Sequence, residues 1–353
     1  LQKRGESVSV ISVKDTVGAL QALAAGYRRK HIPSVPVVGI TGSVGKTTTR
    51  EMTACALSCE KRVFATKGNL NSQVGVPMMV TEIGDEDMAV LELGVSMPGE
   101  MDRIAAAAAP DAAIITNIGI SHIEYLGSRE NILKEKLRIV TGAGKPVPVF
   151  INADNDILSG LSMEGLKDLS IDPSSVSHIY RCGFSEGCDV RAERLELHEG
   201  CPSFLLSFYD RDGDGRLMKE PAMSLEVKLS APGEHMASDA ILALAVCRYF
   251  GIDVKKAAES LASFRSLKGR GEKLEVRGIT VINDSYNAAP DSMKAALSVL
   301  FSMDQAKRRI AVLADMRELG AESRKLHREI GGFIAENAGK IDKVLLYGEL
   351  SRD

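Results

Sequence analysis

From Val35 onward, short apolar runs alternate with segments of helical periodicity. Each run has the length of a strand that is buried on both faces of a sheet. This alternation is typical of an α/β domain in which helices cover both faces of a parallel sheet. The predicted parallel strands are residues 35–40, 88–93, 112–116 and 147–151.

Three strand-like runs with no helix between them follow the parallel part. They predict an antiparallel appendage, because antiparallel strands can be joined by short turns, and residues 199–200 and 212–215 suit such turns. Helices are expected next, over about 235–250 and 254–264. The predicted appendage strands are residues 189–197, 203–209 and 223–229.

A second alternating series follows the linker at 266–271 and predicts a C-terminal, Rossmann-like α/β domain. Its expected elements are strand 279–283, helix 291–303, strand 309–314, helix 322–337 and strand 343–347. The series stops before a full sheet is built, so this domain looks truncated. We therefore divide the chain into residues 1–34, a central domain 35–268 and a C-terminal domain 269–353.

The first 34 residues predict a strand and a helix ahead of the central domain. The strand is expected over Val8–Val13 and the helix over Asp15–Lys30, with Asp15 as its N-cap. Because the chain begins with Leu and ends on a strand followed by a helix start, we expect a fragment at both ends.

Composition changes this picture little. With 353 residues, 44% hydrophobic and 26% charged, the chain is typical of a folded protein of two or three domains. A formal net charge of −3 argues against a dedicated nucleic-acid or membrane-surface binder, and no apolar run has the length of a membrane span. The six cysteines form no CxxC pair, which argues against zinc and favours free thiols in a reducing cytoplasm.

The strongest chemical signal is the segment Val37–Thr49, an apolar strand followed by a glycine-rich turn and a helix start at Lys46. Backbone N–H groups of such a turn, the helix N-terminus and the lysine bind nucleotide phosphates, and the hydroxyl of Thr47 is placed to hold Mg²⁺. The strict P-loop pattern needs glycine where Ile40 lies. The segment therefore predicts a nucleotide-phosphate site and leaves the reaction open.

Two more strand ends carry polar candidates, and ligands bind beyond the carboxyl ends of parallel strands. Glu92, near the end of one strand, could hold the Mg²⁺ that bridges nucleotide phosphates, or it could be an ordinary strand-end acid at the surface. His122 follows the buried strand that leads to Asn117, and it suits a ligand or phosphate contact as well as a loop histidine without a role.

Three further segments contain polar residues that could either take part in the chemistry or have an ordinary structural role. Lys136 lies on the apolar face of the helix predicted over 128–140, which from spacing alone favours a lysine with a buried stem and a solvated head. Asn69 and Asn71 lie in a polar loop that could present amides to a substrate or form a simple turn. Arg270, at the domain junction, could reach a γ-phosphate or lie in a solvated hinge.

Together these segments resemble the Mur ligase family of ATP-dependent amide ligases over nearly the whole chain. The resemblance is carried by Thr41–Thr48, Glu92–Glu100, Thr116–His122, Lys134–Arg138, Gly233–His235 and Asn283–Ala288. Three segments are most similar to the members that join D-alanyl-D-alanine to UDP-N-acetylmuramoyl-tripeptide: Gly68–Ser72, Asp284–Pro290 and Asp315–Gly320. Met236 and Asp239 depart from the resemblance, since the family usually has asparagines there, on the adenine side.

The resemblance implies roles for individual residues. ATP phosphates would be held by Thr41, Gly42, Ser43, Val44, Gly45, Lys46, Thr47 and Thr48. Thr47 and Glu92 would hold one Mg²⁺ and His122 would help to hold a second. Lys136 would be carbamylated, so that its inverted charge also faces Mg²⁺.

The resemblance also implies contacts from outside the phosphate loop. Arg270 and Asp284 would reach ATP from the C-terminal domain, and Lys46, His122, Lys136 and Arg270 would be the catalytic residues. Asn69 and Asn71 would lie along the nucleotide-sugar peptide. Tyr286 and Asn287 would lie near the incoming dipeptide.

The implied activity is peptidoglycan precursor synthesis by a cytoplasmic, monomeric enzyme that uses ATP and Mg²⁺. A substrate carboxylate would attack the γ-phosphate to give an acyl phosphate and ADP, and the amine of D-alanyl-D-alanine would displace phosphate. Residues 1–34 would be the tail of a mostly absent UDP-substrate domain, and 269–353 would form the amino-substrate side. The alternatives are another Mur-type ligase, such as one similar to folylpolyglutamate synthase, and a nucleotide-binding switch without ligase activity.

Overall fold

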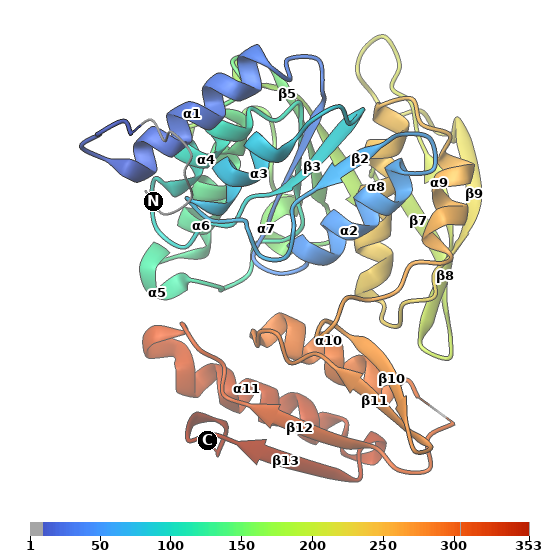
Figure 1. Ribbon diagram of the computed structural model, residues 1–353. Helices are drawn as coiled ribbons and strands as arrows, with labels where there is room; N and C mark the ends of the chain where they lie inside the picture. The colour runs from blue at the N-terminus through green and yellow to red at the C-terminus, as the bar shows by residue number, and fades with distance from the viewer. Residues whose placement is uncertain (1–9, 304, 353) are drawn as a thin grey trace.

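The computed structural model describes residues 10–303 and 305–352, which form a mixed α/β structure (Figure 1). One sheet of nine strands has the order β2-β3-β1-β4-β5-β6-β7-β8-β9. Its strands from β2 to β7 are parallel, and β8 and β9 are antiparallel to their neighbours. The bounds are β1 Val37–Thr41, β2 Val63–Ala65, β3 Met88–Glu92, β4 Ala112–Ile115, β5 Val147–Asn152, β6 Val176–Gly183, β7 Val190–His198, β8 Cys201–Phe208 and β9 Met223–Lys228.

The predicted parallel sheet and its antiparallel strands are confirmed, with one correction to how they are joined. The antiparallel strands extend the main sheet, because β6 pairs in parallel with both β5 and β7. The sequence prediction missed β6 and the three-residue β2. The residues of β6 mix buried, half-buried and exposed positions, and polar side chains such as Ser177 and His178 interrupt the apolar run that marks the other parallel strands.

Helices cover both faces of this sheet. α1, α3, α4 and α6 pack on one face, and α2, α8 and α9 pack on the other. Neighbouring strand residues alternate between the two cores, as Val37 and Val38 do, because successive side chains of a strand point to opposite faces. The helix bounds are α1 Thr16–Lys30, α2 Lys46–Leu57, α3 Gly75–Glu82, α4 Glu100–Ala108, α5 Ile123–Leu126, α6 Arg129–Leu137, α7 Asp156–Ser159, α8 His235–Tyr249 and α9 Val254–Leu261, with 3-10 turns η2 Arg138–Val140 and η3 Pro173–Ser175.

The N-terminal segment agrees with the prediction in its helix and differs in its strand. Asp15 caps α1, and its carboxylate accepts the N–H groups of Val17 and Gly18, both at 3.0 Å. Part of the strand predicted over Val8–Val13 lies outside the described residues. Residues 10–13 form no strand, and the side chains of Val10 and Ile11 are 81% and 85% exposed, so apolar composition alone misled the prediction.

The C-terminal part has its own small core and two two-stranded sheets. The predicted elements are present, and a strand that was not predicted, β10, forms a hairpin with β11. Arg277 and Gly278 turn this hairpin with positive φ values of 52° and 78°. The bounds are β10 Glu272–Val276, β11 Ile279–Asn283, β12 Ile310–Ala314, β13 Lys343–Tyr347, α10 Pro290–Phe301 and α11 Ser323–Glu336, with 3-10 turns η4 Gly320–Glu322, η5 Ala338–Lys340 and η6 Leu350–Arg352.

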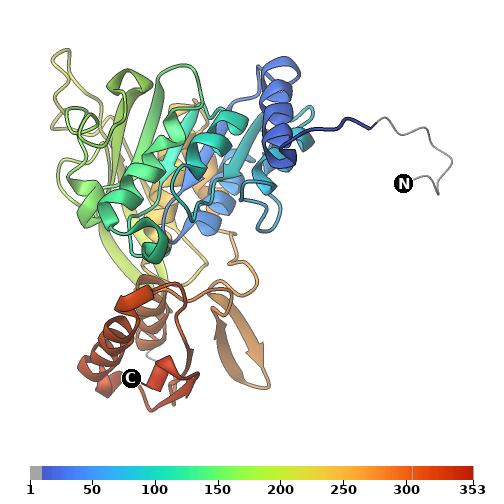
Figure 2. The same cartoon turned by 90° about the vertical axis from the view of Figure 1, so that its left-hand side faces the viewer.

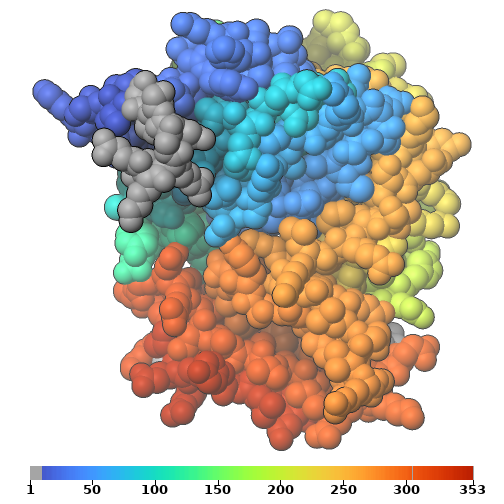
Figure 3. Space-filling model, in the orientation of Figure 1, coloured from blue at the N-terminus to red at the C-terminus, as the bar shows by residue number. Residues whose placement is uncertain are grey.

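The C-terminal part lies directly against the central domain, next to α5 (Figures 1 and 2). In the space-filling view the blue surface of the central domain meets the orange surface of the linker and the following elements (Figure 3). Ile120, in the loop after β4, packs on the C-terminal core, and His122 Nδ1 lies 2.7 Å from Oε2 of Glu318. The loop after β4 is therefore a meeting point of the two parts. In the described part of the chain, no helix is long and apolar enough to cross a membrane.

Candidate active site

The phosphate loop connects β1 to α2 at the carboxyl edge of the parallel strands. Gly42 and Gly45 have φ values of 155° and 82°, and Gly45 is the N-cap of α2. A Cβ on Gly42 would lie 1.9 Å from Oγ1 of Thr116, so no larger residue fits there. The first N–H groups of a helix have no partner within the helix, and at this edge they can bind an anion.

The segment after β4 holds the phosphate loop in place. Oδ1 of Asn117 accepts the N–H groups of Ser43 and Val44 at 3.1 and 2.8 Å, and Oγ of Ser43 accepts the N–H group of Gly119 at 2.9 Å. The sequence prediction assigned Asn117 no role. A polar residue directly after a buried strand that neighbours β1 was the available signal.

Lys46 lies over the loop backbone. Its ammonium group donates to the carbonyl oxygens of Gly42 at 2.8 Å and Ser43 at 3.2 Å. Burial lowers the pKa of Lys46, Glu92 opposes this shift, and the positive charge of Arg270 adds to it. The structure thus places the predicted residues Glu92 and Arg270 within electrostatic reach of Lys46.

Glu92 is 2% exposed, and both of its carboxylate oxygens have partners. Oε2 lies 3.2 Å from Nη1 of Arg50, and Oε1 accepts the side-chain amide of Asn71 at 2.7 Å. The prediction placed Asn71 along a substrate and missed Arg50. Arg50 follows the Lys46-Thr-Thr-Thr run on α2, and its charge at a buried helix position was the available signal.

Lys136 is 1% exposed on α6. Burial lowers the pKa of Lys136 well below its ordinary value, the charge of Lys46 lowers it further, and Glu135 opposes the shift. The side chain therefore does not reach water. The interpretation that spacing alone favoured, a lysine with a buried stem and a solvated head, is wrong. Burial and the nearby ammonium group both favour the neutral amine.

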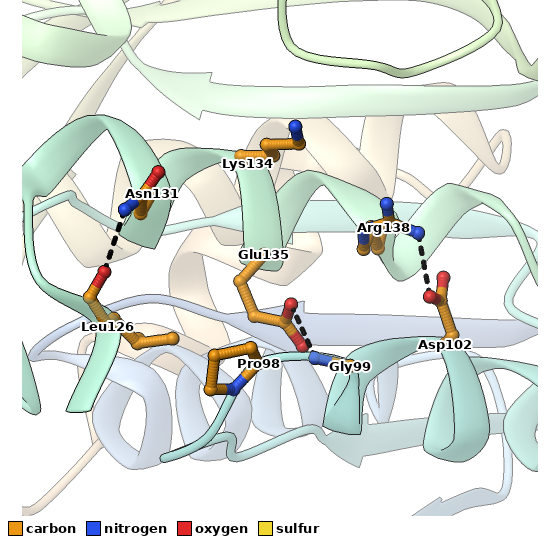
Figure 4. Close-up of a pocket in the computed structure, with 8 residues that line it drawn as sticks. All are labelled: Pro98, Gly99, Asp102, Leu126, Asn131, Lys134, Glu135 and Arg138. Atoms are coloured by element: carbon orange, nitrogen blue, oxygen red, sulfur yellow. Dashed lines mark hydrogen bonds and ion pairs between the residues drawn. The ribbon is translucent and has the colours of Figure 1, made fainter.

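Contacts on another side of α6 fix the helix that carries Lys136 (Figure 4). Glu135 accepts the N–H groups of Gly99 and Met101 at 2.9 Å each, and Arg138 pairs with Asp102 at 2.7 Å. These groups line a pocket of about 370 Å³ that does not include the phosphate loop. The pair of Arg138 and Asp102 and the bonds of Glu135 to the start of α4 hold α6 against α4.

His122 has a left-handed backbone, with φ of 62°, and faces the C-terminal part. Burial lowers the pKa of His122, the carboxylate of Glu318 raises it, and the charges of Lys136 and Lys46 lower it. His122 thus lies within electrostatic reach of both lysines. The ion pair with Glu318 was not predicted.

Arg270 reaches this edge from the linker. Its guanidinium carbon lies 3.8 Å from the ring centre of Tyr286, and Asp284 accepts the N–H group of Gly271 at 3.1 Å. Burial raises the pKa of Asp284, while that hydrogen bond and the charge of Arg270 lower it. Asn287 bonds to the N–H group of Ala288 beside the exposed Tyr286.

The other predicted site residues lie less centrally. Asn69 is exposed and its carbonyl oxygen accepts the N–H group of Asn71 at 2.8 Å. Thr47 is buried and Thr48 half-buried in the first turn of α2. Met236 and Asp239, on α8, are buried, and Oδ1 of Asp239 lies within hydrogen-bond distance of the hydroxyl oxygen of Thr49, at 2.7 Å.

The residues present fit a magnesium ion that is bound together with phosphates. Each oxygen of Glu92 makes one protein contact, which leaves a second lone pair free, and the hydroxyl of Thr47 is a hard oxygen donor. Among the residues that the structure describes, no three His, Cys, Asp or Glu side chains gather into a metal site. Such sparse donors suit Mg²⁺, which takes one or two carboxylates and completes its shell with phosphates and water.

Two family models match the chain in the regions that carry this geometry. The Mur ligase middle domain matches residues 40–247, which is more than half of the chain, and the glutamate ligase domain of Mur ligases matches residues 269–353. The chain belongs to the Mur ligase family.

Named relatives agree with the family models. The UDP-N-acetylmuramoyl-tripeptide--D-alanyl-D-alanine ligase of Bacillus subtilis is 35% identical over 350 residues, covering 98% of this chain and 69% of the relative. MurF from Acinetobacter baumannii has a TM-score of 0.82 at 30% identity, over 98% of this chain and 72% of that one. MurF ligase from Thermotoga maritima, in complex with ADP, has a TM-score of 0.79 at 26% identity, over 98% and 75%.

Folylpolyglutamate synthase shares the fold alone. The enzyme from Mycobacterium tuberculosis has a TM-score of 0.63 at 17% identity, over 95% of this chain and 92% of that one. The predicted alternative of a ligase similar to folylpolyglutamate synthase is therefore the weaker one.

Proposed function

We propose that this chain is an ATP-dependent, ADP-forming amide ligase that joins D-alanyl-D-alanine to UDP-N-acetylmuramoyl-tripeptide. Family membership and the named relatives support this reaction. The observation that carries it is the buried Lys136 beside Lys46, at the edge where Glu92 and His122 also lie. A nucleotide switch has no use for a second buried lysine there, whereas a carboxylate-activating enzyme can use one.

The chain's own residues would stabilise the phosphoryl group during its transfer. N–H groups of the phosphate loop and the start of α2 would bind the ATP phosphates. Lys46 and Arg270 would offset the negative charge on the γ-phosphoryl group as the substrate carboxylate attacks it. The products of this step are ADP and an acyl phosphate, whose carbonyl carbon the amine of the dipeptide then attacks, releasing phosphate.

Lys136 would act as a carbamate. Its neutral amine adds to CO₂ and loses a proton, which gives the side chain a negative charge. The lowered pKa supports this step, because only the neutral amine is nucleophilic.

Thr47, Glu92, His122 and the carbamate of Lys136 would hold Mg²⁺. When bound, Mg²⁺ would neutralise charge between the nucleotide phosphates and the attacking carboxylate. Arg50 and Asn71 would keep the carboxylate of Glu92 oriented for this role.

The C-terminal part would close the site. An acyl phosphate reacts with water, so the site must be covered during the reaction. Glu318 against His122 and the stacked pair of Arg270 and Tyr286 support this role. Asp284 would reach ATP, and Tyr286 and Asn287 would lie near the dipeptide.

Substrate-side roles and location complete the proposal. Asn69 would lie along the nucleotide-sugar peptide, and residues 1–34 would lead in from a domain that binds the UDP part. Residues 35–268 would be the ATP-binding unit and 269–353 the amino-substrate side. The enzyme would act as a monomer in the cytoplasm.

The test is ADP release by the protein that carries this chain, with and without D-alanyl-D-alanine, together with the mass of the product. We expect ADP release to depend on both substrates and the product to gain the mass of the dipeptide minus water. Equal ADP release without the dipeptide, and no amide product, would rule out the ligase reaction. A product formed only with a folate and glutamate would support the alternative ligase.

A further inference from the structure

Asp239 lies against Gly45, the last residue of the phosphate loop, and the proposed mechanism gives Asp239 no role. The residue lies on α8 and is 6% exposed. A Cβ on Gly45 would lie 3.2 Å from Oδ1 of Asp239, so the carboxyl group packs against the glycine that opens α2. A negative charge at this point would lie beside the N-terminus of α2, where the phosphate loop ends.

The hydroxyl group of Thr49 lies between two oxygen atoms, one of which belongs to Asp239. Oγ1 of Thr49 lies 3.0 Å from the carbonyl oxygen of Gly45 and 2.7 Å from Oδ1 of Asp239. A hydroxyl group has one proton to donate, and the carbonyl oxygen can only accept. If the Thr49 proton goes to Gly45, the contact of 2.7 Å needs a proton from Asp239.

An ionised Asp239 leaves one of these contacts unfavourable. Thr49 would then donate to the carboxylate, and its oxygen would face the Gly45 carbonyl oxygen at 3.0 Å with no proton between them. That carbonyl already accepts the N–H group of Thr49 at 2.9 Å. A protonated Asp239 satisfies both contacts of the Thr49 hydroxyl, which is buried.

No nearby charge compensates for ionisation of Asp239. On the turns of α2 and α8 next to it, the charged or titratable groups are Lys46, Arg50, Glu51, Glu234 and His235. Toward the C-terminal ends of the two helices follow Cys55, Cys247, Arg248 and Tyr249. Lys46 bonds to the loop carbonyls, and Arg50 pairs with Glu92 and Glu51. Burial raises the pKa of Asp239 to about 7, opposed only by the hydrogen bond from Thr49.

We propose that Asp239 is a positioning residue that carries a proton while a nucleotide is bound, and that loss of this proton weakens phosphate binding. The inference rests on the proposed function, since it needs a nucleotide at the loop. The neutral acid would hold Thr49 and Gly45 in the geometry that opens α2. Its anion would repel the phosphates and disturb the same contacts.

The test is the Kd for ADP between about pH 6 and pH 9, measured by titration calorimetry on the wild type, Asp239→Asn and Asp214→Asn. Asn can donate its amide proton to Thr49, so Asp239→Asn imitates the protonated acid at every pH. Asp214, on a hairpin with its side chain 78% exposed, is the control for loss of one carboxylate. ADP titrates in the same way with all three proteins, so ratios of Kd isolate the protein's contribution.

We expect the ratio of the wild-type Kd to the Asp239→Asn Kd to be near one at pH 6. It should rise above the pKa of about 7, by up to about tenfold per pH unit, because one proton is linked to binding. Asp214→Asn should follow the wild type. A ratio that does not change with pH overturns the inference and leaves the proposed function standing, whereas no ADP binding at any pH overturns both.

Thr49→Val provides a second readout that does not depend on the folding of Asp239→Asn. Val removes the acceptor for the proton of the neutral acid and also the donor to the anion. Because a hydrogen bond to a charged group is the stronger of the two, the anion loses more, and the pH at which ADP binding weakens should move upward relative to the wild type. A residue with a purely structural role would lower affinity equally at every pH. An unchanged midpoint in Thr49→Val contradicts the proposal.

Discussion

Replacing Glu92 with Gln should destabilise the protein through the buried Arg50. Both side chains are 2% exposed, and Arg50 lies 3.2 Å from Oε2 of Glu92 while Asn71 donates to Oε1. Gln offers one acceptor oxygen where Glu offers two, so its NH₂ group must face either the guanidinium group or the amide of Asn71. A Gln whose NH₂ group faces Arg50 sets two donors against each other, whereas one whose NH₂ group faces Asn71 needs that amide to flip and offer its oxygen. In both arrangements the guanidinium group of Arg50 loses its buried counter-ion.

Breaking a buried pair typically costs 3–5 kcal/mol, and we expect about 2–3 kcal/mol here because Arg50 also bonds to Gly68 and to Glu51. The assay is urea unfolding followed by circular dichroism. Glu51→Gln is the matched control: its carboxylate is 30% exposed and also pairs with Arg50, so its loss should cost at most about 1 kcal/mol.

A double-mutant cycle with Arg50→Met separates the pair from other effects. Without the guanidinium group, Glu92→Gln should cost less, and the coupling should reach about 1.5 kcal/mol or more. If Glu92→Gln and Glu51→Gln have the same small effect, or if the two changes in the cycle add, the buried pair does not hold Glu92 in place.

Three further predictions concern the site. Lys136→Ala should abolish ADP formation without loss of ADP binding, and a short carboxylate such as acetate should restore part of the rate; no rescue, with binding intact, would argue against a carbamate. Gly42→Ala should prevent ADP binding, because its Cβ would lie 1.9 Å from Oγ1 of Thr116, whereas Gly26→Ala, in α1, where the Cβ would meet nothing within 4 Å, should bind normally; equal affinities would contradict this loop geometry. Asp239→Asn should be more stable than the wild type above pH 7. The folded pKa of about 7 exceeds the ordinary 3.8, so the folded state keeps its proton longer and wild-type stability falls as pH rises between these values, by about 4 kcal/mol in all. Urea unfolding at pH 5 and pH 8 checks this, and a stability gap that does not widen would contradict the sign.

The sequence predicted most of the elements, because parallel strands buried on both faces are continuous apolar runs. β1, β3, β4 and β5 have burial patterns without an exposed residue. β6 was missed because its exposed and half-buried positions carry polar side chains. The strand predicted before α1 was wrong, because the side chains of Val10 and Ile11 are exposed and do not join the described core.

Site residues in the phosphate loop or at the end of a strand could be predicted from the sequence. Residues that act through a contact with a distant segment could not. Lys46 and Glu92 follow from a loop and a strand end. Arg50, Asn117 and Glu318 act through Glu92, Ser43 and His122, which lie 42, 74 and 196 residues away, respectively, and spacing along one segment does not show such pairs. Asp239 lies 190 residues from Thr49, so only the packing of α8 on α2 reveals their contact.

Transfer of oxygen from the substrate carboxylate to phosphate tests the central claim most directly. The terminal carboxylate of UDP-N-acetylmuramoyl-tripeptide is labelled with ¹⁸O at both oxygens, and the released phosphate is analysed by mass spectrometry after reaction with ATP and D-alanyl-D-alanine. Formation of an acyl phosphate predicts one labelled oxygen in each phosphate and one in the new amide. Unlabelled phosphate, released at the same rate as ADP, would show that water attacks ATP and would contradict carboxylate activation.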